Sequence, residues 1–243
     1  MDTKDRILDA AEHLFARHGF QGASLRAITA AAGANLAAVN YHFRSKDALI
    51  QAVLARKLGP INRQRFALLD AFEAEAGSGP VPLEKLVRAM MEPMLRSAGE
   101  TAGGSMSFGA VMGRMYLEEN DQIQRLLVAE LRDVIRRFLK AIGRTLPGVP
   151  LDELYWRIFF TVGAVSHTIS APRMLGLISG GACSPSDVES SLERLVNYVV
   201  AGLKAPLPVS AQGKDTPSSR TARARSSDRK HRNVPGASPA SSR

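Results

Sequence analysis

The sequence predicts an all-α fold. Apolar residues recur three or four positions apart from the N-terminus to about residue 203, which is the spacing of a helix face. No part of the first sixty residues alternates apolar and polar positions with a period of two, as a half-buried strand would. Short runs containing Gly, Pro, Ser or Asn separate the segments, so we expect helices joined by tight connections.

Four helices are expected in the first sixty residues. The first covers residues 3–18 and stops at Gly19, because glycine readily takes the left-handed conformation that ends a helix. The next three follow residues whose side chains can accept a hydrogen bond from a free backbone N–H, namely Ser24, Asn35 and Ser45. They cover residues 25–32, 36–42 and 46–58, and Gly59-Pro60 is expected to end the last of them.

The rest of the chain is expected to form further helices and a tail. The predicted helices cover residues 61–76, 83–98, 106–119, 151–170 and 185–203. Between 119 and 151, an apolar stripe from Ile123 to Ile142 predicts one more long helix, which Pro147 ends. The helix over 151–170 is apolar nearly all round, so it has to be covered on two sides. After Pro206 the composition changes to Ser, Ala, Pro, Arg and Thr with almost no large apolar residue. Residues 206–243 are therefore predicted to be a disordered basic tail.

Composition narrows the class of protein. The 243 residues are 45% hydrophobic, which suffices for a core, and the apolar runs are too short to cross a bilayer. We therefore expect a soluble, cytoplasmic protein without a signal peptide or a membrane partner. The single cysteine, Cys183, excludes an intramolecular disulfide and a cysteine-based zinc cluster. The sequence has no phosphate loop, nucleophile elbow or dinucleotide fingerprint, and its five histidines are scattered, so no enzyme, cofactor or metal site is expected.

Positive charge is concentrated at the two ends of the chain. Residues 1–65 carry ten Lys/Arg against five Asp/Glu, and residues 206–243 carry eight against two. Residues 66–205 carry fourteen against sixteen. This asymmetry indicates that a polyanion meets the ends while the middle has another role.

The stretch from Gly33 to Leu49, GANLAAVNYHFRSKDAL, has the residue types of a DNA-reading helix. Two short helices joined at Gly33 match the helix-turn-helix arrangement, in which the second helix enters the major groove. Small residues allow close approach, an asparagine can pair with adenine, and basic residues near helix starts can bind phosphates. The predicted DNA-binding residues are Arg26, Ala37, Ala38, Asn40, Tyr41, His42, Arg44 and Lys46.

Part of the same stretch is expected to be core. Val39 and Phe43 lie four residues apart, so both should face inward in a helix. We expect them to pack against apolar residues of the two preceding helices, namely Leu14, Phe15, Leu25 and Ile28. A helical hairpin with a glycine turn also occurs in proteins that do not bind DNA, so the spacing alone leaves both interpretations open.

Three sequence matches carry a resemblance to the TetR family of transcriptional regulators. They are AAEHLFARHGF at Ala10–Phe20, ITAAAG at Ile28–Gly33, and YHFRSKDAL at Tyr41–Leu49. The resemblance implies an all-helical protein of about nine helices. An N-terminal helix-turn-helix domain (1–50) would read DNA, and a C-terminal helical domain (51–205) would bind a ligand and form the dimer. The sequence departs from the family pattern at two places in this stretch. Leu36-Ala37 stands where Lys-Gly is usual, and Asn40 stands where Tyr is common.

A narrower resemblance concerns the effector. FGAVMGRMYLEEN and VPLDELYWRIFFTVGA, together with LAAVNYHFRSKDALIQAV upstream, resemble the PsrA-type, fatty-acid-responsive branch of the family. This implies a repressor that senses fatty acids or acyl thioesters such as acyl-CoA. A TetR-like regulator that answers to drugs or other apolar compounds and controls efflux genes is the alternative.

Six of the eight methionines fall between Met90 and Met115, and such flexible thioethers suit a pocket for a long apolar ligand. Methionines at helical spacing are also common core residues, so both interpretations stay open. Arg114 and Arg157 lie in apolar stretches, where each could pair with a ligand carboxylate or form a structural salt bridge. The predicted pocket residues are Met91, Phe108, Met112, Arg114, Met115 and Arg157.

The last two predicted helices are expected to form a homodimer. Each carries an apolar stripe, and two helices from each of two chains would make a four-helix interface. The predicted interface residues are Leu154, Ile158, Val162, Leu192, Leu195 and Val199. A twofold dimer would present two recognition helices about one DNA turn apart and would read a palindromic operator in double-stranded DNA.

Overall fold

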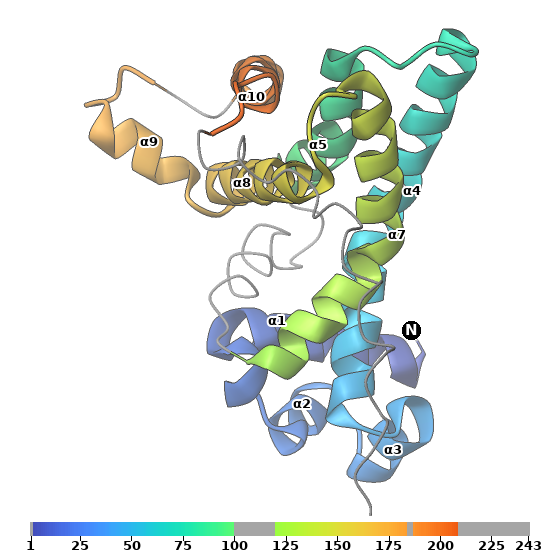
Figure 1. Cartoon of the computed structure of the whole chain (residues 1–243). Helices are drawn as coiled ribbons and strands as arrows, with labels where there is room; N and C mark the ends of the chain where they lie inside the picture. Colours follow the sequence, from blue (N-terminus) through green and yellow to red (C-terminus); the bar gives the residue numbers. More distant parts are fainter. Residues whose placement is uncertain (1, 100–119, 184–186, 209–243) are drawn as a thin grey trace, which may run out of the picture. The chain divides into compact units, whose positions relative to one another are not determined.

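The computed structural model describes residues 2–99, 120–183 and 187–208. Within these residues the chain forms nine α-helices and no strand, which confirms the all-α prediction. In chain order the helices are α1 (Thr3–Gly22), α2 (Leu25–Ala31), α3 (Leu36–Phe43), α4 (Lys46–Ala76), α5 (Leu83–Gly99), α7 (Asp121–Thr145), α8 (Leu151–Ser170), α9 (Pro172–Ile178) and α10 (Val188–Leu203) (Figure 1). The helix predicted over 106–119 and the tail beyond Pro208 lie outside the described residues.

The first three helices and the start of α4 pack together into one head. α1 contacts α2, α3 and α4, and α3 contacts α2 and α4. Their shared core is apolar, and the inward positions predicted for Val39, Phe43, Ile28 and Phe15 are confirmed, since all four side chains are buried. Regular helical geometry in α1 is interrupted at the predicted residue, Gly19, where φ is 75°.

The three predicted N-caps are confirmed. Ser24, Asn35 and Ser45 each accept a hydrogen bond from the backbone N–H three residues on, at 3.1, 2.8 and 3.1 Å. Each bond pairs a donor that the first turn of a helix leaves unpaired. The starts of α2, α3 and α4 are thus determined by local sequence.

The predicted break at Gly59-Pro60 is wrong, because α4 continues through Pro60 to Ala76. Proline removes one backbone hydrogen bond and disfavours a helix interior. Here two residues close to it in sequence, Leu58 and Ile61, are buried, and α4 packs against α5 and α7. Tertiary packing therefore outweighs the local propensity.

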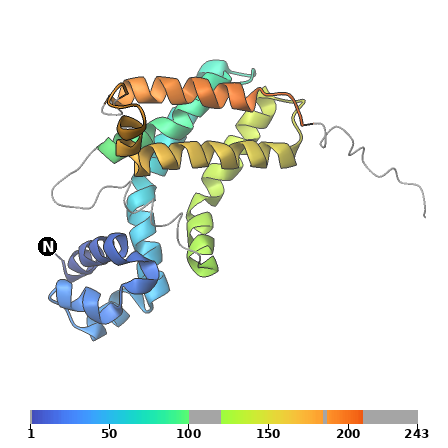
Figure 2. The ribbon, with the colours of Figure 1, turned by 90° about the vertical axis from the view of Figure 1, so that its left-hand side faces the viewer.

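The C-terminal helices are built around α5, which contacts α4, α7, α8 and α10. α7 lies beside α4, and Gln51 Nε2 donates to Glu130 Oε1 across them at 3.4 Å (Figure 1). α8 and α10 lie next to each other, and α9 forms part of the connection between them (Figure 2). α10 is capped by Asp187, whose side chain accepts from the backbone N–H groups of Glu189 and Ser190. The cap predicted at Ser184 lies outside the described residues.

Among the described residues, the helices are too short or too polar for any of them to cross a membrane.

Candidate functional site

The turn between α2 and α3 depends on Gly33. Its φ of 57° lies in the left-handed region, which costs a residue with a side chain roughly 1 kcal/mol or more. The backbone N–H of Ala34 donates to the Thr29 carbonyl at 2.9 Å and closes the turn. The turn therefore sets the direction in which α3 leaves α2. The buried side chains of Val39 and Phe43 anchor α3 to the core of the head.

The opposite face of α3 is exposed. Tyr41 has 83% of its surface in solvent, and Ala37 and Asn40 are exposed beside it. Ala38 and His42 are half-buried, and the rings of Tyr41 and His42 meet edge to face with centroids 5.0 Å apart. Small, amide and aromatic side chains on one short exposed helix can approach base edges in a major groove.

Basic residues lie next to this exposed face. Arg26 on α2 and Arg44 after α3 are exposed. Arg44 has φ of 65° and is the one non-glycine residue with positive φ among the described residues. Lys46 begins α4 and its Nζ donates to the Gln21 carbonyl at 3.1 Å, so this lysine ties α4 to α1 in the DNA-free head. The eight residues predicted to bind DNA thus lie on α2, on α3, in the turn after α3 and at the start of α4.

A buried acid joins the head to α4. The side chain of Glu12 on α1 is 4% exposed, and its two oxygens lie 3.0 Å from Arg56 Nε and 2.7 Å from Lys57 Nζ. Arg56 also pairs with Asp9. Burial alone would lower the pKa of Arg56, but the hydrogen bond that Arg56 donates to Asp9 and the negative charges of Glu12 and Asp9 raise it above its ordinary value. These ion pairs fix α1 on α4, and both of these helices contact α3.

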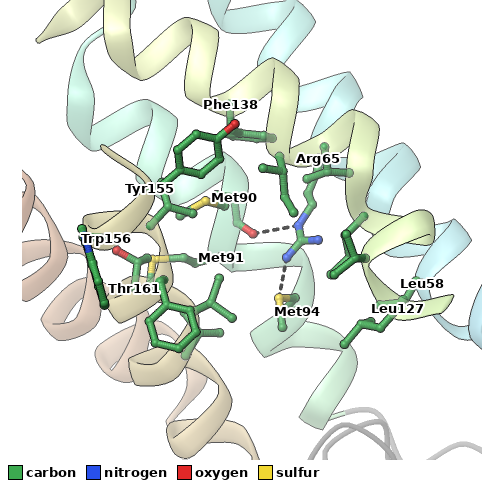
Figure 3. A pocket seen from close by; sticks show the side chains of 18 residues that line it. Leu58, Arg65, Met90, Met91, Met94, Leu127, Phe138, Tyr155, Trp156 and Thr161 are labelled. Atoms are coloured by element: carbon green, nitrogen blue, oxygen red, sulfur yellow. Dashed lines mark hydrogen bonds between the residues drawn. The ribbon is translucent and has the colours of Figure 1, made fainter. Parts of the chain in front are cut away.

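A cavity of about 580 Å³ lies between α4, α5, α7 and α8 (Figure 3). Volumes of a few hundred to about 1,000 Å³ are typical of small-molecule sites. The described lining side chains are almost all apolar, and methionines and aromatic rings are prominent among them, namely Met90, Met91, Met94, Phe138, Tyr155, Trp156 and Phe159. The cavity can therefore take an apolar molecule without leaving polar groups unpaired.

One charged residue stands among the described lining residues, and it is Arg65 on α4. Only 5% of its surface is exposed. Its Nε donates to the Met90 carbonyl at 2.9 Å, one terminal nitrogen donates to Asn62 Oδ1 at 3.0 Å, and the other contacts Met94 Sδ (Figure 3). Sequence analysis missed this residue. The signal was available, because Arg65 continues the apolar stripe of Leu58, Ile61 and Leu69 on α4.

The predicted pocket residues have different positions. Met91 lines the cavity. Arg157 is not among the residues that line the cavity, so the prediction that it meets a ligand is wrong for this cavity. Its guanidinium instead forms hydrogen bonds to other residues of the chain. Its Nε donates to Glu153 Oε1 at 2.8 Å and a terminal nitrogen donates to the Leu203 carbonyl at the end of α10. Phe108, Met112, Arg114 and Met115 lie outside the described residues.

The predicted dimer stripe lies inside its own chain. Leu154, Ile158, Leu192 and Val199 are buried in the single chain, and Val162 and Leu195 are half-buried. A second copy of the chain could bury little additional surface of these six side chains. They are therefore poor candidates for the dimer contact, and this prediction is corrected. The periodicity located apolar faces correctly, but it could not tell the inner face from the outer one. The exposed large side chains of α8 and α10 are Tyr155, Trp156, Phe159, Phe160 and Tyr198, and the first three of these also line the cavity.

An exposed reading helix on a three-helix head, joined by one long helix to a domain with an apolar cavity, defines a ligand-responsive DNA-binding regulator. Two family matches agree with this class. Residues 7–53 match the bacterial regulatory proteins of the tetR family, and residues 88–202 match the tetracyclin repressor-like C-terminal domain. The two matches together cover about two thirds of the chain, and the chain belongs to the TetR family of transcriptional regulators. Family membership also confirms that the protein is a regulator and not an enzyme.

Individual relatives agree at the level of the family. The nicotine-responsive transcriptional repressor HdnoR of Paenarthrobacter nicotinovorans is 29% identical over 134 residues, which span 53% of this chain and 69% of HdnoR. The regulator UidR of Escherichia coli K12 is 42% identical over 52 residues, which are 21% of this chain and only 26% of UidR. The solved structure of the fatty acid degradation regulator FadR from Bacillus halodurans aligns with a TM-score of 0.55 over 85% of this chain and 98% of its own. At 14% identity this alignment shows a common fold alone.

Proposed function

We propose that the protein is a homodimeric repressor that binds a palindromic operator and is released from it by an apolar effector. The observation that carries this proposal is the path of α4. Leu49, Ile50 and Val53 of this helix are buried in the part of α4 that packs against the head, and Leu58 and Arg65, one to three turns further on, line the cavity. A ligand that fits one position of α4 better than another therefore changes the position of the reading helix. Such differential binding is what couples an effector to DNA affinity.

The outer surface of α8 and α10 supports the homodimer. Phe160 and Tyr198, which do not line the cavity, are 64% and 71% exposed, which is unusual for rings of this size in an isolated protein. Gly163 and Gly202 lie on the same two helices, and a Cβ at either position would meet nothing within 4 Å. Glycine inside a helix costs about 1 kcal/mol, and close approach of a partner helix is a reason to keep it. We therefore place the partner on this aromatic and glycine surface rather than on the buried stripe.

The effector is proposed to be a fatty acid or an acyl thioester. The size of the cavity and its methionine-rich wall support a flexible apolar chain. A drug-like apolar compound, with efflux genes as the target, is the second candidate, and the exposed aromatic rings at the cavity favour it, because flat rings stack on aromatic side chains.

Two experiments test the function. DNA fragments selected from a genomic library by the full chain should share an inverted repeat, and footprinting should protect both half-sites about one helical turn apart. Sedimentation of the DNA-free protein at micromolar concentration should give a dimer, and Phe160→Glu should give a monomer that has lost operator binding. A wild-type monomer, or protection without an inverted repeat, contradicts the proposal.

A third experiment distinguishes the two effector classes. Acyl chains and cationic drugs are added to the operator complex, and the class that releases the DNA is the class of the effector.

A further inference from the structure

The cavity has two ends of different character. Tyr155, Trp156 and Phe159 of α8 line the first, which we call the aromatic end, and all three are exposed. Leu58 of α4 and Leu127 of α7 line the second, the leucine end, and both are buried. Figure 3 shows Trp156 at one side of the cavity and the two leucines at the opposite side. A ligand that fills the cavity therefore has one end near solvent and the other inside the protein.

The aromatic end suits the polar group of a ligand. Tyrosine and tryptophan combine an apolar ring with a polar tip, and they are common where an apolar region meets water. Val128 of α7 is the fourth exposed residue of the described lining, and its side chain has no group that can form a hydrogen bond. A polar ligand group is therefore better placed beside the rings of α8 than beside Val128.

The interior of the cavity suits hydrocarbon. No acidic residue occurs among the described residues that line it. Arg65, the charged residue among them, donates to the Met90 carbonyl and to Asn62 Oδ1. The hydroxyl of Thr161 donates to the Arg157 carbonyl at 2.8 Å. The polar groups of the described wall are thus bound to the protein itself, and a polar ligand group buried among the leucines would lose its bonds to water at a cost in free energy.

Leu58 connects the leucine end with the reading head. It directly follows Arg56 and Lys57, which form ion pairs with Glu12 on α1 at 3.0 and 2.7 Å. A ligand group that presses on Leu58 therefore presses on the part of α4 that is tied to the head. A molecule that stays at the aromatic end can fill part of the cavity without this contact.

We infer that the effector is a linear amphipathic molecule whose polar group lies at the aromatic end and whose hydrocarbon chain ends against Leu58. Its chain length then determines whether it releases the operator. This inference rests on the proposed effector function of the same cavity. A chain too short to reach Leu58 binds without favouring one position of α4, and a ligand with no such preference shifts no equilibrium.

Binding is measured through Trp156, since it is the one tryptophan of the chain and it lines the cavity. The full-length protein is titrated with octan-1-ol, decan-1-ol, dodecan-1-ol and tetradecan-1-ol. Each added pair of carbons should strengthen binding about tenfold until the chain reaches Leu58, and longer chains should gain nothing more. An affinity that does not depend on chain length contradicts the inference.

A second hydroxyl tests the orientation of the chain. The α,ω-diol of the tightest-binding length has to place one hydroxyl among the leucines, so it should bind about tenfold or more weakly than the alcohol. Equal affinities of diol and alcohol would overturn the inference, because the far end of the chain would then lie in water or beside a polar group.

Release of DNA is measured by fluorescence anisotropy of the labelled operator at saturating alcohol. The tightest-binding alcohol should release the operator. Octan-1-ol at saturation should leave the operator bound and should compete with the longer alcohol. If octan-1-ol releases the DNA as completely as the longer alcohol does, contact with Leu58 is not required and the inference fails.

Two variants separate the contact at Leu58 from the stability of α4. Leu58→Ala enlarges the leucine end, so the shortest alcohol that releases the operator should become longer by roughly two carbons. Leu69→Ala is the matched control, because Leu69 is also a buried leucine of α4 but is not among the described lining residues. An equal shift in both variants would assign the effect to a weakened α4. The comparison of alcohol and diol uses the wild type, so it tests the inference even if a variant does not fold.

The outcomes also separate this inference from the proposed function. If alcohols of every length release the operator at saturation, the effector function stands and the length dependence is excluded. If no alcohol binds but a rigid apolar compound releases the operator, the effector function stands and the linear class is wrong. If no alcohol binds and no apolar compound releases the operator, the proposed effector function fails first.

Discussion

Helix α3 carries core side chains and the side chains predicted to read DNA within eight residues. Val39 and Phe43 face the head, and Asn40 and Tyr41 are exposed to solvent between them in sequence. The helical period explains this division, because residues four apart share a face and adjacent residues do not. We therefore expect stability and DNA recognition to depend on different residues of this one short helix, so that each can be changed separately.

Replacing Asn40 by alanine tests this separation. The side chain is exposed, so the melting temperature should stay within about 1 °C of the wild type. Loss of one bidentate amide–adenine contact should weaken binding to the operator by about 1–3 kcal/mol, with little change for scrambled DNA. Fluorescence anisotropy with both duplexes measures the two affinities. Gln64→Ala, an exposed amide on α4, is the matched control. An equal loss on both duplexes would show that Asn40 does not read a base.

At the level of single helices, α4 shows what the sequence could and could not predict. The start of α4 follows from Ser45 and its bond to the Ala48 N–H, which is a local interaction. Its continuation past Pro60 depends on packing against helices that lie far away in the sequence. Local rules therefore predicted the start and failed at the proline.

The same division between local and long-range causes applies to the site. The turn at Gly33 and the exposed face of α3 follow from neighbouring residues, and both were predictable. Arg65 and Arg157 both interrupt apolar helical stripes, and only the three-dimensional arrangement shows that the first lines the cavity and the second holds the end of α10. α9 was not predicted, because it is only seven residues long and has no buried side chain to give it a periodic pattern.

Replacing Pro60 by alanine should stabilise α4. The change restores a backbone N–H that can donate to the Arg56 carbonyl, and Pro60 itself is exposed, so no packing is lost. The expected gain is about 1–3 kcal/mol, which corresponds to a rise of roughly 2–4 °C in melting temperature per kcal/mol. Thermal denaturation followed by circular dichroism measures it. A lower melting temperature would mean that the backbone geometry imposed by the proline is required for the packing of α4 against α5 and α7.

For the molecule as a whole, ion pairs connect α5 with α10, the last of the described helices. Glu189 on α10 accepts from Arg88 and Arg96 on α5, each at 3.0 Å, and Lys204 donates to Glu84 at 2.9 Å. The hydrogen bond from Arg88 lowers the pKa of Glu189, and that from Lys204 lowers the pKa of Glu84. Because α10 also carries part of the proposed dimer surface, these pairs hold that surface on the cavity domain.

The lowered pKa values predict the acid dependence of stability. A carboxylate with a lower pKa in the folded state stabilises the protein above its ordinary pKa, and this contribution is lost as the pH falls through the folded value. The melting temperature of Glu189→Gln should therefore be below that of the wild type at pH 7, and the difference should vanish well below pH 4.5, the ordinary glutamate value. Glu193→Gln, on the same helix, is the control. A difference that persists at pH 3 would assign the effect to packing rather than to charge.

The ion pairs of Glu12 should determine how strongly ligand binding in the cavity is coupled to the position of the head. Glu12 is buried against Arg56 and Lys57 on α4, immediately before the segment that lines the cavity at Leu58. Glu12→Gln keeps the shape and removes the charge, so it should cost about 1–3 kcal/mol of stability. Since α1 is then held less firmly on α4, a displacement of α4 should move the head less. The measured quantity is the operator affinity without effector divided by that with effector. In allosteric proteins this ratio reflects a coupling of about 1–3 kcal/mol, and in Glu12→Gln it should fall towards one.

Asp9→Asn, at the exposed edge of the same cluster, is the control and should lower this ratio much less. An unchanged ratio in Glu12→Gln, together with a lower melting temperature, would show that the ion pairs hold the head in place without transmitting the signal.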